Sequence, residues 1–104
     1  MIESITTYDL LPGIDEKAYN EWSKKAVGTI LKGSGVVELR AGRNTLGTPQ
    51  IKVATVFKSY ADWAKALETW WPPLEAELRK FSTNLRVEIW GPSPNVPDVL
   101  RPAK

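Results

Sequence analysis

Residues 50–63 read QIKVATVFKSYADW and contain a change from a strand pattern to a helix pattern. Over residues 50–58 every second side chain is apolar or β-branched, as expected of a strand with one buried face. Ser59 and Asp62 then form a capping-box-like motif, which indicates that a helix starts directly after the strand. The side chains predicted to share the buried face are Ile51, Val53, Thr55 and Phe57.

The segment after Ser59 has the clearest helical periodicity in the chain. Apolar side chains from Tyr60 to Phe81 recur at steps of three, four and seven residues, which predicts a helix with one apolar face. Pro72-Pro73 must interrupt this helix, because proline lacks an amide donor and restricts the residue before it. We therefore predict one helical segment over residues 60–70 and a second from the prolines to about residue 81.

Three further elements precede this stretch. Residues 2–10 are rich in β-branched types and end at a turn signal, so they are predicted to form a strand. Residues 16–31 have apolar side chains at helical spacing, and Asp15 stands where an N-cap belongs. Residues 36–42 alternate again. Their expected faces are Val37, Leu39 and Ala41 on one side and Val36, Glu38 and Arg40 on the other.

A fourth strand is predicted over residues 84–90, which completes the order βαββαβ. This order is that of the ferredoxin-like α+β fold, a four-stranded antiparallel sheet with two helices on one face. The expected domain covers residues 1–91. Residues 92–104 are rich in proline and are predicted to form a tail that is irregular or lies extended against a partner.

A sheet with helices on one face leaves its second face open. Charged side chains predicted there are typical of a solvated or interfacial ion-pair network, and an arginine among them would also suit a bound anion. The first strand adds either Thr7 or Tyr8 to this face, depending on its register. The other expected members are Glu38, Arg40, Arg86, Glu88 and Trp90.

Two residue types are missing altogether, cysteine and histidine. Without them there is no disulfide framework, no thiolate nucleophile, no imidazole base and no histidine ligand for iron or zinc. The carboxylates have no EF-hand spacing that would indicate Ca²⁺. We therefore expect no cofactor and no metal.

Charge and hydropathy exclude further classes. A formal net charge of +2 without a basic run disfavours a nucleic-acid partner. The RNA-recognition motif shares the βαββαβ order, but residues 51–58 lack its base-stacking aromatic pattern. No apolar stretch approaches the ~20 residues that span a bilayer, and no signal peptide is visible after Met1. The expectation is a cytoplasmic protein with no membrane partner.

Three short motifs resemble the dimeric α+β barrel superfamily, which includes antibiotic-biosynthesis monooxygenases and EthD-like and NIPSNAP-like proteins. They are Pro12-Gly13, the helix segment Tyr19-Asn20-Glu21-Trp22 and the junction Phe57–Trp63. The resemblance implies a homodimer in which two sheets close face to face. It also implies a cavity between each sheet and its helices for an aromatic or polyketide-like molecule, and cofactor-independent monooxygenase or isomerase chemistry. Haem-degrading and polyketide-cyclising members depend on a histidine, which this chain lacks.

The candidate site residues follow from this resemblance and from the patterns above. An arginine would stabilise developing negative charge and a tyrosine or carboxylate would move a proton, with Arg40, Arg86 and Tyr8 as the catalytic candidates. Aromatic residues at helical spacing are also ordinary core residues, so a non-catalytic binding or dimerisation domain is the alternative. The ligand-binding candidates are Trp22, Trp63, Trp70, Thr55 and Phe57.

Overall fold

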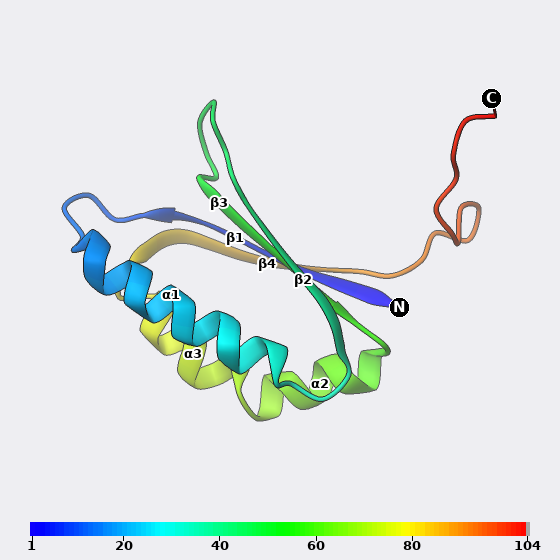
Figure 1. Cartoon of the computed structure of the whole chain (residues 1–104), viewed down its shortest axis with the longest axis horizontal. Helices are drawn as coiled ribbons and strands as arrows, with labels where there is room; N and C mark the ends of the chain where they lie inside the picture. The colour runs from blue at the N-terminus through cyan, green and yellow to red at the C-terminus, as the bar shows by residue number, and fades with distance from the viewer. Residues whose placement is uncertain (104) are drawn as a thin grey trace.

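In the computed structural model, which describes residues 1–103, four strands form one sheet and the helices all lie on one of its faces (Figure 1). The element order is βαββαβ, with the second helical region divided in two. The elements are β1 (Ile2–Leu10), α1 (Glu16–Leu31), β2 (Val36–Arg43), β3 (Ile51–Phe57), α2 (Tyr60–Glu68), α3 (Trp71–Leu78) and β4 (Ser82–Trp90).

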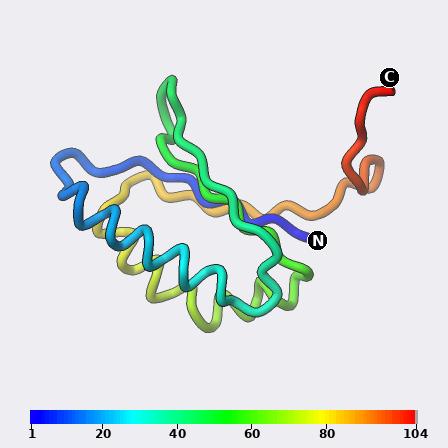
Figure 2. The backbone as a smooth tube through the Cα atoms, in the orientation of Figure 1, coloured from blue at the N-terminus to red at the C-terminus, as the bar shows by residue number. Residues whose placement is uncertain are grey.

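The strand order is β2-β3-β1-β4, and all neighbouring strands run antiparallel. Helix α1 links β1 to β2, and the α2–α3 pair links β3 to β4, so each connection crosses over one intervening strand (Figure 2). Because both crossovers lie on the same side, one face of the sheet is covered and the other is open. The predicted α+β, ferredoxin-like architecture is confirmed.

Two helix starts are capped by the side chains that the sequence indicated. The Asp15 carboxylate accepts hydrogen bonds from the backbone N–H groups of Lys17 and Ala18 at 3.0 and 3.2 Å. The Ser59 hydroxyl accepts from the Asp62 N–H at 3.2 Å and donates to its carboxylate at 3.0 Å. These bonds satisfy amide groups that have no partner inside a helix.

Both helical segments of the region interrupted by proline end earlier than the periodicity predicts, although the first begins at Tyr60 as expected. Helix α2 ends at Glu68 rather than at residue 70, and α3 ends at Leu78 rather than near residue 81. The prolines lie in the first turn of α3, where a missing amide donor costs nothing. Trp70 and Trp71 therefore stand at the break between the two helices.

One predicted face of strand β2 differs from the face in the structure. A bulge shifts its register between Val36 and Glu38, so that Val36 pairs with Phe57 and Glu38 pairs with Val56. Val36 packs against the core, whereas Val37 is 47% exposed. The prediction that Val37 shares the inner face with Leu39 is wrong, because a bulge adds one residue to the strand and so breaks the strict alternation on which the prediction rests.

The register of β1 shows which of Thr7 and Tyr8 lies on the open face of the sheet. Thr7 pairs with Arg86 and lies on the open face, while Tyr8 is 3% exposed and points toward the helices.

The β1–β4 register shifts between Thr7 and Asp9. The buried Asp9 carboxylate accepts hydrogen bonds there from the Gln50 N–H and the Asn84 side-chain amide. Asn84 has a φ of 56°, a backbone conformation that asparagine tolerates well.

Residues 92–103 contain no helix or strand and run away from the sheet and helices (Figures 1 and 2). Val99 and Leu100 are exposed in this segment, at 76% and 73%. Within residues 1–103 no helix combines the length and apolar character needed to cross a membrane.

Candidate functional site

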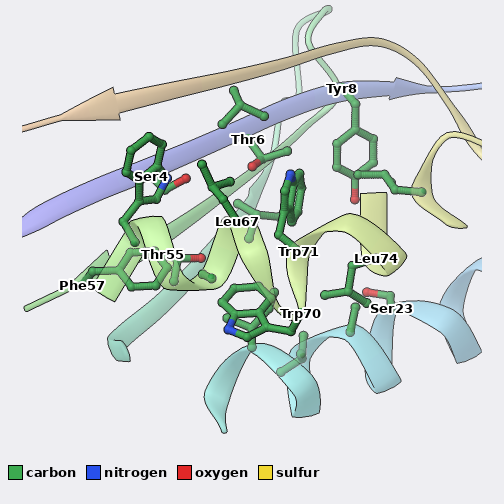
Figure 3. Close-up of a pocket in the computed structure, with 18 of the residues that line it drawn as sticks. Ser4, Thr6, Tyr8, Ser23, Thr55, Phe57, Leu67, Trp70, Trp71 and Leu74 are labelled. Atoms are coloured by element: carbon green, nitrogen blue, oxygen red, sulfur yellow. The ribbon is translucent and has the colours of Figure 1, made fainter. Parts of the chain in front are cut away.

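A cavity of about 80 Å³ lies between the inner face of the sheet and the helices (Figure 3). One water molecule needs about 10–15 Å³ on this measure, so the cavity has room for several waters or a small organic group. Its walls come from β1, β3, β4 and all three helices. None of the side chains that line it is charged.

Hydroxyl groups supply the polar part of the lining. Ser4 and Thr6 reach in from β1, Thr55 from β3 and Ser23 from α1 (Figure 3). Thr6 and Thr55 are only 8% and 7% exposed. A hydroxyl both donates and accepts hydrogen bonds, so these four side chains can orient a neutral ligand but cannot neutralise a charged one.

Aromatic rings and aliphatic side chains form the remaining wall. Phe57 is 2% exposed and stacks on Trp70, with ring centroids 6.3 Å apart and planes 17° from parallel. Trp71 stands beside them at the break between α2 and α3 (Figure 3). Such rings present a large, stiff apolar surface to a flat ligand.

Two buried indole groups in this wall have no hydrogen-bond partner within residues 1–103. They are the Nε1 atoms of Trp22, on α1, and Trp63, on α2. An indole N–H can only donate, and leaving a buried donor unpaired costs about 1–3 kcal/mol. An acceptor oxygen on a molecule in the cavity would satisfy such a donor.

A pair of tyrosines adjoins the cavity. The hydroxyls of Tyr8 and Tyr19 lie 2.6 Å apart in a buried hydrogen bond. Burial raises the pKa of Tyr8 far above its ordinary value, the hydrogen bond to Tyr19 adds to the rise, and Arg43 opposes it. Tyr8 is therefore a neutral phenol at physiological pH, able to share a hydrogen bond but unable to act as a base.

The two arginines predicted as catalytic lie on the other face of the sheet. Arg40 forms ion pairs with Glu3 at 2.6 Å and Glu38 at 2.7 Å. Arg86 pairs in register with Thr7, while its neighbour Val87 lines the cavity. The sheet thus separates both guanidinium groups from Tyr8, and the three residues do not form one site within a protomer.

The structure does bring the predicted ligand-binding residues together. All five line the cavity: Trp22, Trp63, Trp70, Thr55 and Phe57.

Sequence reasoning missed the lining residues with short hydroxyl side chains, Ser4, Thr6 and Ser23. The alternation of β1 contains the signal for Ser4 and Thr6, because both share a face with Ile2 and Tyr8. That signal becomes readable only once the inner face of the strand is known. Ser23 lies four residues after Tyr19 and three before Ala26, but a serine at that spacing does not indicate an apolar face.

The sheet order and the one-sided helices define a ferredoxin-like α+β fold, and solved structures similar to this chain include a putative antibiotic biosynthesis monooxygenase and an uncharacterized NIPSNAP domain protein. No protein-family model and no curated protein sequence matches the chain.

Several solved structures have a similar fold. SnoaB, a cofactor-independent oxygenase from Streptomyces nogalater, is similar with a TM-score of 0.73 and 14% identity, covering 93% of this chain and 97% of that one. A putative antibiotic biosynthesis monooxygenase from Deinococcus radiodurans has a TM-score of 0.77 and 8% identity over 100% of both chains. A dimeric, ferredoxin-like protein of unknown function from Bacteroides fragilis has a TM-score of 0.67 and 16% identity, covering 86% and 93%. At these identities the likeness establishes the fold.

Proposed function

We propose that this protein binds a small, largely aromatic molecule in the cavity between its sheet and helices. The observation that carries the proposal is the pair of unpartnered indole donors, Trp22 Nε1 and Trp63 Nε1, in a buried wall without charge. The ligand part inside the cavity is therefore uncharged, has flat apolar rings and carries at least one acceptor oxygen, such as a carbonyl.

Calorimetric titration with two probes tests this proposal. Naphthoquinone offers carbonyl acceptors, whereas naphthalene has the same ring system and none. Replacing either tryptophan by phenylalanine keeps an aromatic ring and removes the donor. We expect Trp63→Phe or Trp22→Phe to weaken naphthoquinone binding by about fivefold, the value of one hydrogen bond, and to leave naphthalene unaffected. Wild-type protein that binds neither probe would overturn the proposal.

Catalysis is the second part of the proposal. The likeness to SnoaB, described as a cofactor-independent oxygenase, favours oxygenation of an electron-rich phenol or hydroquinone. No group lining the cavity is a carboxylate or an imidazole, and Tyr8 is a neutral phenol. A substrate would therefore have to ionise by itself, which disfavours isomerase chemistry based on a proton shuttle.

Oxygen uptake separates the enzyme from the non-catalytic alternative. A naphthohydroquinone is mixed with the protein in air-saturated buffer, and the rate is compared with spontaneous oxidation. An excess rate that saturates with substrate supports catalysed oxidation, and an oxygen atom from O₂ in the product distinguishes an oxygenase from oxidation to the quinone with release of H₂O₂. A protein that binds the probe and leaves the oxidation rate unchanged is a binding protein.

We also propose that the open face of the sheet pairs with a second copy of the chain. Ile5 and Val56 are half-buried on this face, and the Glu3–Arg40–Glu38 ion pairs span β1 and β2 beside them. The description of the Bacteroides fragilis neighbour as dimeric supports association of two copies.

A further inference from the structure

An open groove lies beside the cavity, between α1 and strands β2 and β3, and has a volume of about 300 Å³. Four residues line both the groove and the cavity: Tyr8, Ser23, Val27 and Val53. The two spaces therefore share a wall, and a molecule that fills the cavity can extend along this wall into the groove.

Besides being larger and more open, the groove differs from the cavity in its charge. Its surface is mostly apolar, with Leu39, Ala41 and Ile51 from the strands. At one end lies Arg43, the last residue of β2 and the sole charged side chain among those that line either space. Among the residues that the structure describes, no carboxylate forms an ion pair with Arg43.

Arg43 is also close to the shared wall. Its positive charge acts on the Tyr8 hydroxyl, opposing the rise in the pKa of that group. Tyr8 lines both spaces, and its hydrogen-bond partner Tyr19 lines the groove together with the Arg43 guanidinium. A guanidinium presents a fork of donors that matches the two oxygens of a carboxylate.

We infer that the groove is the second half of the binding site and that the ligand is an amphipathic aromatic carboxylate. Its rings occupy the cavity and its carboxylate pairs with Arg43. This inference rests on the proposed binding function and adds the ligand's charged end. It also assigns a specificity role to Arg43, which neither the strand pattern nor the resemblance indicated.

The matched pair of probes is naphthylbutanoate and its primary amide. The two have the same rings and linker, and they differ in charge at the end that would reach Arg43. Binding of each is measured by calorimetry to the wild-type protein, to Arg43→Gln and to Lys24→Gln. Lys24 is exposed on α1 next to Ser23 and lines neither space, so its variant removes one positive charge without touching the site.

We expect the wild-type protein to bind the acid about fivefold more tightly than the amide, with a preference that falls as salt is added. Arg43→Gln should abolish this preference and leave the affinity for the amide unchanged. Lys24→Gln should keep the preference. Because Arg43 is exposed, the variant is expected to fold, and an unchanged melting temperature verifies this.

The outcomes separate the inference from the function beneath it. Binding of the amide without any preference for the acid overturns the Arg43 subsite and leaves the proposed function standing. The subsite is likewise overturned if Arg43→Gln retains the preference, or if Lys24→Gln loses it equally. Failure of both probes to bind a wild-type protein that binds naphthoquinone overturns the subsite and leaves the proposed function standing. Failure of naphthoquinone as well overturns both.

Discussion

The hydroxyl of Tyr8, on β1, lies 2.6 Å from the hydroxyl of Tyr19, on α1, and the two residues are 3% and 7% exposed. This hydrogen bond is the polar link between strand and helix at the wall where cavity and groove meet. Each hydroxyl satisfies the other, so neither remains an unpaired polar group in an apolar layer. The pair therefore contributes to stability as well as to the shape of the site.

Replacing both members of the pair should cost less than the sum of the two single replacements. In Tyr8→Phe or Tyr19→Phe the remaining hydroxyl is buried without its partner, and we expect a loss of about 1–3 kcal/mol. In the double variant no hydroxyl is stranded, so its loss should be smaller than the sum of the two single losses. Urea unfolding of the four proteins measures this cycle, and strictly additive losses would contradict a direct coupling.

Stability should fall in alkaline solution because of Tyr8. Its pKa is raised in the folded protein, chiefly by burial, whereas in the unfolded chain it ionises near the usual value of about 10. The contribution of Tyr8 is therefore complete below about pH 10 and is lost progressively above it, since the unfolded state then releases the proton first. The free energy of unfolding at rising pH measures the effect, and Tyr8→Phe should show a shallower alkaline decline than wild type.

Phe57 should be the most sensitive position in the cavity wall. It is the largest fully buried side chain among residues 1–103 and stacks on Trp70. We expect Phe57→Ala to lower the free energy of unfolding by about 3–5 kcal/mol, through lost burial and an enlarged cavity. Leu46→Ala provides the control, since Leu46 is 97% exposed and its truncation should change stability by no more than about 0.5 kcal/mol.

Two glycines should respond to alanine in opposite directions. Gly28 lies within α1 with open space around its Cα, so Gly28→Ala should stabilise the protein by about 0.5–1 kcal/mol. Gly35 has a φ of +76°, and a Cβ there would meet the Asp62 carboxyl group. Gly35→Ala should cost more than about 1 kcal/mol. Thermal unfolding of both variants gives the comparison, and a stabilising Gly35→Ala would contradict the close approach of the β2 entry to α2.

The open sheet face should determine the mass in solution. Light scattering across a wide concentration range should give twice the protomer mass of 11.6 kDa. Ile5→Glu places a negative charge directly across from Glu88 in the middle of that face and should shift the mass to that of the protomer, because an unpaired buried charge opposes association. A monomeric wild-type protein would contradict the proposed pairing.

Much of the fold was predictable from local patterns. Alternation over residues 50–58 identified the face of β3 that carries Thr55 and Phe57, and both side chains line the cavity. Helical spacing similarly predicted that Trp22 and Trp63 lie on the inner side of their helices, and Trp70, at the break between α2 and α3, also lines the cavity. These predictions succeed because the period of a buried face is a property of the chain itself.

The arrangement of the catalytic candidates was not predictable in this way. Tyr8, Arg40 and Arg86 each lie on a strand, but their faces depend on the register of β1 and on the bulge in β2. A shift of one residue moves a side chain to the opposite face. The tertiary structure alone shows that the sheet separates Tyr8 from both arginines.

By itself, then, the sequence determined the element order, the interruption of the second helical region near Pro72-Pro73 and the capped helix starts, since each depends on residues close together in the chain. Its composition also excluded cysteine and histidine chemistry. Only the tertiary structure decided that the indole donors of Trp22 and Trp63 are left unpaired, that Tyr8 meets Tyr19, and that Arg43 ends an apolar groove. The physical reason is that hydrogen-bond partners and burial are set by segments distant in sequence, which come together only when the helices pack on the sheet.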